Sequence, residues 1–423
     1  MKILVAGQGG REHALLTALG ADSSSNTPNT PPTTPTPHTL YCWPGSDAIA
    51  ELAARPDASD VPTLVAWAVS EGIDLVVAGQ EKYLAEGLAD QCKAAGVRCF
   101  GPSQHATQLE SSKAFAKDFM ARHHVPTADY TVVNNEAELR AAATTLPVVL
   151  KYNGLAAGKG VSVCHEPAQV DEFCERVFQQ ELYGKDTVVV EQCMFGPELS
   201  VICAIAGDEY RMFPHARDYK PLLDGDAGPN TGGMGAIASK DIIDAELSTR
   251  IEAEVIRPTV AGLVADKLDY HGFLYFGLML TDTGPRMIEF NCRFGDPEAQ
   301  AVLPLLEGSF AQYLYKAAAG ELDNSLLQVK DGWSVGVILA SAGYPASSSK
   351  GDLLSGLDAV THLFHSGTRK TEAGYVTNGG RVLCCVAHGN TRAEAVAAAY
   401  AEADKVSFDG MQRRTDIGTA NFD

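Results

Sequence analysis

The stretch MIEFNCRFGDPE, residues 287–298, is the part of the chain around which we predict the fold. Its apolar and polar residues alternate, so in an extended strand they point to opposite faces. A carboxylate, an amide oxygen and a guanidinium about 7 Å apart suit a hard cation that bridges phosphate oxygens, although an isolated pattern of this kind is more often a solvated edge strand. The predicted apolar face holds Ile288, Phe290 and Cys292, and the polar face holds Glu289, Asn291 and Arg293.

Length and composition indicate a globular protein of two to four domains. The chain has 423 residues, of which 45% are hydrophobic and 20% are charged, and this is enough to bury full cores. The formal net charge of -20 leaves no basic face that could neutralise phosphodiester charge, so we expect no nucleic-acid partner and no membrane partner. Any phosphate must therefore be bound locally.

Cysteines and apolar runs indicate a cytoplasmic protein. The ten cysteines show no C-x-x-C spacing, which argues against a zinc site or a disulfide framework and suits a reducing cytosol. No window approaches 18 apolar residues, and the N-terminal apolar run is too short for a signal peptide. We therefore expect a soluble, intracellular protein.

Residues 1–103 are predicted to form a doubly wound domain with a parallel sheet. Apolar strands alternate with helical patterns in this part of the chain, and that order is typical of such a sheet. Residues 22–39 are rich in Pro and Thr, and we interpret them as an inserted loop. The predicted strands are 3–6, 40–43, 75–78 and 97–100, and the predicted helices are 11–19, 60–71 and 84–95.

Two strand ends of this sheet carry candidate binding residues, because parallel sheets bind ligands at the carboxyl ends of their strands. Gly9 and Gly10 open the first helix, where backbone amides can take a phosphate, with a tight structural turn as the alternative. Glu81 follows the third strand and could accept hydrogen bonds from sugar hydroxyls. A dinucleotide site is disfavoured, because Glu12 stands where G-x-G-x-x-G needs its third glycine.

Two segments carry lysines, of which the second is more informative. Lys113 and Lys117 share one face of a predicted helix, and such lysines are usually solvated. Lys151 ends an apolar strand and leads into GLAAGKG, residues 154–160, whose bare backbone can wrap phosphates. The loop is not a Walker motif, because Gly160 stands where that motif requires Ser or Thr.

A predicted hinge and a glycine-rich loop follow. After the predicted strand 187–190, Glu191 and the linker 193–195 could meet a base edge and Glu198 could meet ribose hydroxyls, although two surface glutamates would look the same. Residues 225–235 contain five glycines, which we expect to exclude helix and regular strand. We interpret this segment as a lid or a substrate-cradling loop.

The rest of the chain is predicted to complete a mixed α+β core. The segment after about residue 327 is expected to pack back on this core as a smaller domain. The predicted elements are a helix at 247–268, a strand at 274–280 that pairs with 286–293, strands at 334–340 and 381–386, and a helix at 392–403.

Six long motifs, spread in order along the chain, resemble those of the phosphoribosylamine–glycine ligase family of the ATP-grasp superfamily. The superfamily alone would account only for the lysines, the hinge and the metal-binding strand, so the resemblance is specific to the family. The motifs are GGREHAL at 9–15, GLAAGKGV at 154–161, GPNTGGMGA at 228–236, IEFNCRFGDPE at 288–298, TNGGRVL at 377–383, and SFDGMQ with RRTDIG at 407–418.

The resemblance implies a fold and a reaction. The fold is an N-terminal domain of residues 1–103, an ATP-grasp domain of residues 104–326 whose residues from about 125 to 195 form a mobile lid over ATP, and a C-terminal domain of residues 327–423. The reaction joins glycine to 5-phosphoribosylamine in de novo purine biosynthesis through glycyl phosphate, with ATP as co-substrate and Mg²⁺ or Mn²⁺ as cofactor. The resemblance also implies a cytoplasmic monomer.

The resemblance further assigns roles to individual residues. Glu289 and Asn291 match metal ligands, Arg293 and Lys220 match groups at the transferred phosphoryl group, and Asp218 would face glycine or the acyl phosphate. The implied ATP-binding residues are Lys113, Lys151, Gly154, Gly158, Lys159, Gly160, Glu191, Met194 and Glu198. The implied substrate-binding residues are Gly9, Gly10, Arg11, Glu81, Asn230, Thr231, Gly232, Gly233 and Arg381.

Two other functions remain as alternatives at this point. Another purine-pathway ATP-grasp enzyme would keep the hinge and the metal strand but would not explain GPNTGGMGA. A non-catalytic nucleotide-sensing or NAD-binding module would not explain the intact set of lysine, carboxylate, amide and guanidinium groups. The chain departs from the family pattern at Gln80, Lys82, Tyr152, Asn153, Tyr219 and Pro221, none of which is an implied ligand.

Overall fold

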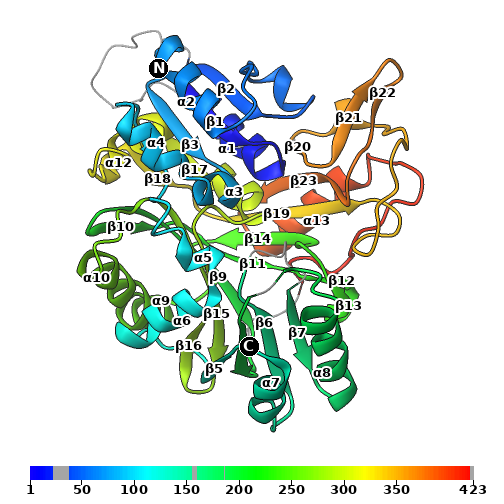
Figure 1. The fold of residues 1–423 in the computed structure, drawn as a ribbon. Coiled ribbons are helices and arrows are strands. Elements are labelled where there is room, and N and C mark those ends of the chain that lie inside the picture. The colour runs from blue at the N-terminus through cyan, green and yellow to red at the C-terminus, as the bar shows by residue number, and fades with distance from the viewer. Residues whose placement is uncertain (22–37, 155–159, 185, 420–423) are drawn as a thin grey trace.

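The structure is a computed structural model that describes residues 1–21, 38–154, 160–184 and 186–419 (Figure 1). The predicted loop 22–39 lies almost entirely outside these described residues. Figure 1 shows the N-terminal sheet at the top, a long central sheet across the middle and a third sheet at the bottom. No helix within the described ranges is long and apolar enough to cross a membrane.

The N-terminal sheet is parallel, as predicted, with the strand order β2-β1-β3-β4. The predicted helix 84–95 is wrong in one respect: two shorter helices meet at Gly87, whose φ of 82° favours glycine. The elements are β1 (Lys2–Gly7), α1 (Gly10–Gly20), β2 (Thr39–Pro44), η1 (Ile49–Glu51), α2 (Val61–Glu71), β3 (Leu75–Ala78), α3 (Glu81–Ala85), α4 (Leu88–Ala94) and β4 (Cys99–Phe100).

A four-stranded antiparallel sheet in the order β5-β8-β6-β7 has an apolar core of its own, in which Leu150, Phe173 and Val188 are fully buried. We call it the lid sheet, although its mobility stays a prediction. A separate core means that this sheet does not depend on the central sheet to bury its apolar face. Its elements are β5 (Tyr130–Val133), α7 (Glu136–Ala142), β6 (Val148–Tyr152), β7 (Val161–Cys164), α8 (Pro167–Cys174), η2 (Glu175–Gln179) and β8 (Val188–Gln192).

The central sheet is antiparallel, with the strand order β16-β15-β9-β11-β14-β19-β23-β20 and with β10 beside β9. The predicted pairing of 274–280 with 286–293 is confirmed, and the predicted helix 247–268 runs through α9, η4 and α10. The elements are α5 (Gln108–Ser111), α6 (Lys113–Arg122), β9 (Glu198–Ala206), β10 (Glu209–Met212), β11 (His215–Asp218), β14 (Gly235–Ser239), α9 (Ala245–Ile251), η4 (Glu252–Ile256), α10 (Arg257–Ala265), β15 (His271–Thr281), β16 (Gly284–Asn291), α11 (Glu298–Val302), η5 (Leu303–Leu305), β17 (Leu306–Gly308), α12 (Phe310–Ala317), η6 (Asn324–Leu326) and β18 (Leu327–Val329).

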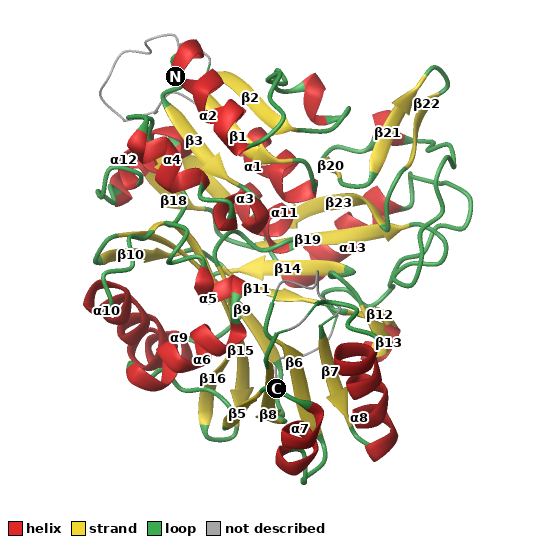
Figure 2. Cartoon of the chain, in the orientation of Figure 1, coloured by secondary structure: helices red, strands yellow, loops and turns green. Residues whose placement is uncertain are grey.

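The C-terminal strands continue the central sheet. β19 pairs with β14, β23 pairs with β19, and α13 packs along both C-terminal strands (Figure 2). The strands and the helix predicted in this segment are confirmed, whereas the domain boundary near residue 327 stays a prediction. The elements are β19 (Trp333–Ala340), η7 (Leu357–Ala359), β20 (Leu363–His365), β21 (Thr368–Thr371), β22 (Gly374–Thr377), β23 (Arg381–Gly389) and α13 (Arg392–Ala403).

The glycine-rich segment 225–235 is more regular than predicted. β12 (Pro221–Leu223) and β13 (Ala227–Asn230) pair as an antiparallel hairpin through the short turn η3 (Asp224–Asp226), with a register shift between the strands. The expectation that glycines exclude a strand is therefore wrong for 227–230. Gly228 has a φ of 82° and lies in the stretch where the register shifts, and the pairing continues at Asn230.

β16 has an irregularity that changes one predicted face. Its pairing with β15 shifts by one residue at Ile288, which is the extra residue of a β-bulge. Met287 therefore takes the predicted place of Ile288 in the core, beside Phe290 and Cys292. The carbonyl oxygen of Ile288 accepts a hydrogen bond from Lys151 Nζ at 3.1 Å. The bulge thus ties the central sheet to the lid sheet.

Two buried histidines meet where α1 packs on β20. The backbone N–H of His365 donates to His13 Nδ1 at 3.0 Å, and the ring centroids are 5.7 Å apart. Burial lowers the pKa of each histidine to about 4. Both rings are therefore neutral at physiological pH.

We expect acid to weaken this contact. Between the ordinary histidine pKa of 6.5 and about 4, the unfolded chain binds protons that the folded histidines do not, so the free energy of unfolding falls as the pH falls. At 1.36 kcal/mol per pKa unit, each histidine accounts for up to about 3 kcal/mol of this loss in the free energy of unfolding. The free energy of unfolding is measured by urea unfolding near pH 7.5 and about pH 5, and His365→Gln should reduce the difference between the two values. The exposed His362→Gln should keep the wild-type dependence, and equal slopes in all three proteins would contradict the prediction.

Candidate active site

Glu289 on β16 lies within the electrostatic reach of three lysines. Burial acts to raise its pKa, but Lys220, Lys151 and Lys113 together hold that pKa below its usual value. Asn291 Nδ2 lies 3.5 Å from Glu289 Oε1, on the same polar face of the strand. The carboxylate therefore stays ionised among ammonium groups from three other segments. A divalent cation and a polyphosphate would meet opposite charges in this place.

Arg293 connects the polar end of β16 to two other elements. Its Nη2 lies 2.9 Å from Glu110 Oε1 and 3.0 Å from Asn291 Oδ1, and its Nε lies 3.4 Å from Glu81 Oε2. Burial raises the pKa of Glu110 to about 7, although Arg293 acts against this. Glu110 also accepts the backbone N–H of Cys292 at 2.6 Å. Glu110 is absent from the residues predicted from the sequence, because its partner Cys292 lies 182 positions away along the chain.

Glu191 on β8 bridges two lysines. Its Oε1 lies 2.9 Å from Lys151 Nζ and its Oε2 lies 3.0 Å from Lys117 Nζ, with all three side chains at most 6% exposed. The solvated-face alternative is therefore wrong for Lys117, whose burial lowers its pKa to about 8. Lys117 also donates to Thr127 Oγ1 at 2.7 Å. The Glu191 carboxylate thus orients Lys151, and its contact with adenine stays a prediction.

Lys220 and Glu198, expected at the γ-phosphate and the ribose, pair with each other at 2.5 Å. Burial acts to lower the pKa of Lys220, but Glu198 and other acidic neighbours raise it well above its usual value. Burial, with the charge of Glu298, raises the pKa of Asp218. Asp218 Oδ1 is buried and accepts no hydrogen bond from any described residue. Such an oxygen suits an incoming ammonium group.

The glycine turn before α1 is folded around Glu12. The backbone N–H groups of Gly9 and Gln8 donate to Glu12 Oε2 at 2.6 and 3.2 Å, and Arg11 Nε lies 2.7 Å from Glu12 Oε1. A Cβ atom at Gly7 would lie 2.3 Å from Glu12 Cγ, so a glycine is required there. A phosphate could reach these amides only by displacing Glu12.

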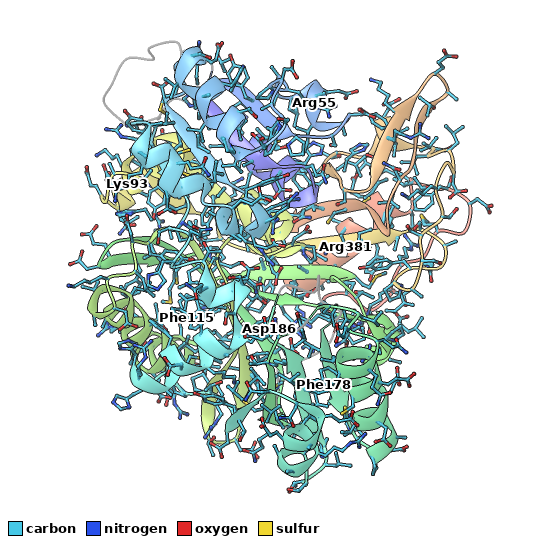
Figure 3. All side chains as sticks on the ribbon, in the orientation of Figure 1. Arg55, Lys93, Phe115, Phe178, Asp186 and Arg381 are labelled. Atoms are coloured by element: carbon cyan, nitrogen blue, oxygen red, sulfur yellow. The ribbon has the colours of Figure 1, made fainter. Side chains whose placement is uncertain are left out.

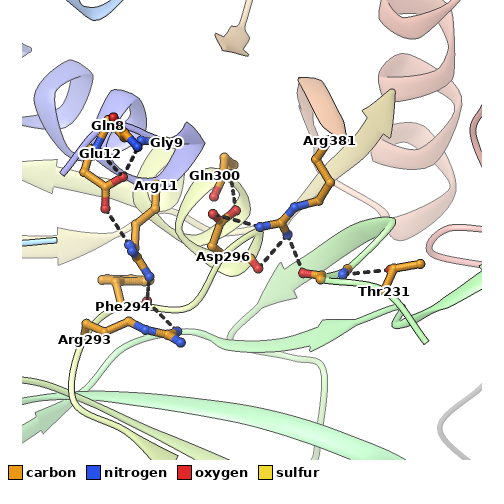
Figure 4. A network of polar contacts seen from close by, with 12 residues as sticks. Gln8, Gly9, Arg11, Glu12, Thr231, Arg293, Phe294, Asp296, Gln300 and Arg381 are labelled. Carbon is orange, nitrogen blue, oxygen red and sulfur yellow. Dashed lines mark hydrogen bonds and ion pairs between the residues drawn. The ribbon is translucent and has the colours of Figure 1, made fainter. Parts of the chain in front are cut away.

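Arg381 links the glycine-rich loop to the turn after β16, in the middle of the molecule (Figures 3 and 4). Its Nη2 lies 3.0 Å from Asp296 Oδ2, and its Nη1 donates to the carbonyl groups of Asp296, at 2.8 Å, and Gly232. In the same turn, the carbonyl oxygen of Phe294 accepts from Arg11 at 3.2 Å and from the preceding arginine at 3.3 Å. Predicted substrate residues from three distant segments therefore meet at one turn.

The loop after β13 is held by its own contacts. Thr231 Oγ1 donates to the carbonyl of Lys220 at 2.7 Å and accepts from the N–H of Gly233 at 3.0 Å. Gly233 has a φ of 108°, and a Cβ there would lie 2.5 Å from Asp218 Oδ1. This glycine therefore keeps the approach to Asp218 open. Of the other predicted residues, Gly10 begins α1, Asn230 ends β13, Gly154, Gly160 and Met194 flank strands of the lid sheet, and Gly158 and Lys159 lie outside the described residues.

Glu289 and Asn291 fit a divalent cation only together with other oxygen ligands. Within the part of the chain that the structure describes, no three Asp, Glu, His or Cys residues are grouped so that they could hold a metal ion. Mg²⁺ is commonly bound by one or two carboxylates plus substrate phosphates and water. The two residues therefore fit a cation that arrives with ATP, and such a cation would supply positive charge for the phosphate groups.

Comparison with known proteins decides the family. The N domain of phosphoribosylglycinamide synthetase matches residues 1–110, its ATP-grasp (A) domain matches residues 111–299, and its C domain matches residues 334–420. The chain belongs to the phosphoribosylamine–glycine ligase family. It is therefore an ATP-grasp carbon–nitrogen ligase of purine biosynthesis, as the sequence motifs predict.

Individual relatives agree with this family. A phosphoribosylamine–glycine ligase of Vibrio cholerae is 40% identical, and the match covers 99% of this chain and 98% of the relative. The crystal structure of the Thermotoga maritima ligase superposes with a TM-score of 0.85 at 30% identity, covering 99% and 100% of the two chains. The biotin carboxylase domain of a Hydrogenobacter thermophilus 2-oxoglutarate carboxylase, solved with MgADP, shares the fold at a TM-score of 0.73 and 15% identity, covering 97% and 91%.

Proposed function

We propose that the chain joins glycine to 5-phosphoribosylamine by two displacements. The glycine carboxylate first attacks the γ-phosphate of ATP to form glycyl phosphate and ADP. The ribosylamine nitrogen then attacks the acyl carbon and loses a proton, while the bond between that carbon and the phosphate oxygen breaks. Phosphate leaves, and glycinamide ribonucleotide is the product. The observation that carries the proposal is the position of Glu289 among Lys113, Lys151 and Lys220, since this arrangement supplies positive charge for phosphoryl transfer around a carboxylate for the cation.

The phosphate end of the reaction would use the lysines in different ways. Lys151 is already oriented by Glu191 at 2.9 Å and by the carbonyl of Ile288 at 3.1 Å, so little side-chain freedom is lost when phosphate binds. Lys220 is held by Glu198 at 2.5 Å and would leave that partner for the γ-phosphate. We infer that Glu198 is then released for the ribose hydroxyls.

The glycine end would use Asp218 and the loop beside it. The Asp218 oxygen that accepts no hydrogen bond from the described residues would receive the ammonium group of glycine, and that positive charge would favour the ionised form of the carboxyl group. Lys220 lies two residues further along the same extended segment, so its side chain is on the same side as that of Asp218. A glycine whose ammonium group lies at Asp218 would therefore point its carboxylate toward Lys220 and the γ-phosphate. The hydrogen bonds of the Thr231 hydroxyl to the carbonyl of Lys220 and to the N–H of Gly233 would hold this loop beside the acyl phosphate.

The acceptor end would lie at the turn after β16. Arg11 and Arg381 bring two guanidinium groups to this turn and would attract the phosphate of phosphoribosylamine. Burial acts to raise the pKa of Glu81, but Arg293 and Arg11 hold it below its usual value. An ionised Glu81 would accept hydrogen bonds from the ribose hydroxyls.

The cellular setting belongs to the same proposal. We infer a cytoplasmic monomer that uses Mg²⁺ or Mn²⁺ with ATP and has no nucleic-acid partner. The proposed domains are residues 1–103, 104–326 and 327–423, with the lid sheet closing over ATP. The separate apolar core of the lid sheet supports this division, because such a body can move without opening the central core.

The function is tested by measuring ADP release with ATP, glycine and phosphoribosylamine generated in situ. Omission of glycine should abolish ADP release, because its carboxylate is the first nucleophile. Hydroxylamine added in place of phosphoribosylamine should trap glycyl phosphate as glycine hydroxamate. ADP release that does not depend on glycine would contradict the proposed function.

Glu81→Ala should weaken the use of phosphoribosylamine more than the use of ATP. Loss of a charged acceptor for the ribose hydroxyls should raise KM for phosphoribosylamine about tenfold or more, with KM for ATP within about twofold. Glu86→Ala is the matched control, because this exposed glutamate lies close in the chain and pairs only loosely with Lys82, at 3.8 Å. Equal losses for both substrates would remove Glu81 from the acceptor site.

A further inference from the structure

The hairpin β12–β13 leads into the loop that we assign to glycine, yet it forms a two-stranded sheet by itself. All four residues of β13 are exposed, and Leu223 on β12 is 54% exposed. A two-stranded hairpin is marginally stable in water, so contacts from other segments must hold it in place.

The end of the described chain supplies these contacts. Arg414 is 1% exposed, and its Nη1 lies 2.8 Å from Asp226 Oδ1 and donates to the carbonyl of Pro221 at 3.1 Å. Its other nitrogens bind Asp416 at 2.6 and 2.7 Å. Asp416 Oδ2 also accepts the N–H of Gly225 at 2.8 Å. One buried guanidinium therefore holds the first residue and the turn of the hairpin together.

A second contact lies at the turn itself. Asp224 accepts the backbone N–H of Thr415 at 2.7 Å and also the Thr415 hydroxyl. Both residues are exposed, so this contact can be removed without burying an unpaired charge. Removing the contact between Asp224 and Thr415 is therefore a milder change than removing the buried Arg414 side chain.

The same tail contacts the back of the proposed catalytic segment. Tyr219 lies between Asp218 and Lys220, and its backbone pairs with residues 234 and 235 at 2.8 and 3.0 Å. In such an extended segment its side chain points opposite to its two neighbours. Tyr219 is 1% exposed, its hydroxyl accepts the N–H of Gly418 at 3.0 Å, and its ring centroid lies 5.1 Å from the Arg414 guanidinium.

We propose that Arg414 is a positioning residue for the ligation reaction, acting with residues 415–418 through the hairpin and through Tyr219. The tail holds the back of the segment whose front carries Asp218 and Lys220, and it fixes the hairpin that leads into the glycine loop. This inference rests on the proposed function, because it assigns glycine and the γ-phosphate to that segment.

Arg414→Ala should lower kcat/KM for glycine about tenfold or more, because small misplacements of positioned groups cost large factors in rate. KM for phosphoribosylamine should stay within about twofold, since the hydrogen bonds and ion pairs of Arg11, Glu81 and Arg381 among the described residues involve none of residues 414–418. The Asp224→Ala/Thr415→Val double variant should lower kcat/KM for glycine by a smaller factor of about threefold or more. This double variant decides the question if Arg414→Ala does not fold.

Arg413→Ala is the matched control. Arg413 is the neighbouring arginine and pairs at 2.5 Å with Asp404 at the end of α13 and not with a hairpin residue, so its variant should keep wild-type glycine kinetics. A folded Arg414→Ala protein with glycine kinetics equal to those of Arg413→Ala would overturn the inference, and so would equal losses for glycine and phosphoribosylamine. Absence of glycine-dependent ADP release in the wild-type protein would instead overturn the proposed function.

Discussion

Glu289→Ala is expected to lower kcat by at least about a thousandfold with the fold intact, because the proposed cation site would lose its carboxylate ligand on β16. The same change removes the negative charge that Lys113, Lys151 and Lys220 share, so their mutual repulsion is offset less than in the wild-type protein. The measurement is glycine-dependent ADP release over a range of Mg²⁺ and Mn²⁺ concentrations, with circular dichroism to check the fold.

Two further variants make this result specific. Glu289→Gln keeps the size of the side chain and removes its charge, so it should be nearly as inactive as the alanine variant. Glu254 on η4 pairs with Arg250 at the surface, and Glu254→Ala should keep kcat within about twofold. Near wild-type turnover of Glu289→Ala at any metal concentration would remove Glu289 from the metal site.

Arg293→Ala is expected to lower both stability and turnover. Glu110 loses the cation 2.9 Å from its carboxylate while it remains buried, which should cost about 3 to 5 kcal/mol of unfolding free energy. Loss of the fixed positive charge beside Asn291 should lower kcat by about a hundredfold or more. Arg293→Lys keeps the charge but loses the planar fork that reaches Glu81, Glu110 and Asn291 together, so it should recover only part of either loss.

A double variant separates the two effects. Arg293→Ala/Glu110→Gln removes the unpaired carboxylate, so its unfolding free energy should return toward the wild-type value while kcat stays low. Arg257, whose side chain is 65% exposed on α10, provides the control, and Arg257→Ala should keep wild-type turnover. Recovery of turnover in the double variant would show that Arg293 acts only by stabilising the fold.

The main strands and helices could be predicted because their patterns are local. Apolar runs and alternation located β1, β3, β15 and β16, and these patterns depend on residues next to one another in the chain. The bulge at Ile288 could not be predicted in the same way, because register depends on the partner strand β15. The helix break at Gly87 could have been predicted from the sequence, since glycine has a low propensity for the interior of a helix.

The candidate site could be predicted to the extent that its residues look unusual in sequence. Lys151 before its glycine-rich loop and the alternating polar residues of β16 look unusual in this sense. Glu110 and Lys117 did not, because each looks like an ordinary charge on a helix surface. Only the fold reveals their burial against Arg293 and Glu191, on segments far away in the chain.

The order of strands in the central sheet has a consequence for synthesis of the chain. β14 lies between β11 and β19, and its edge is covered only when residues 333–340 arrive. On the ribosome, a chain ending soon after residue 239 would therefore expose an unpaired strand edge while almost a hundred further residues are added. We expect the pairing of the central sheet, whose strand β11 ends at Asp218, to be completed late. Nascent chains in this interval should therefore depend most on protection from aggregation.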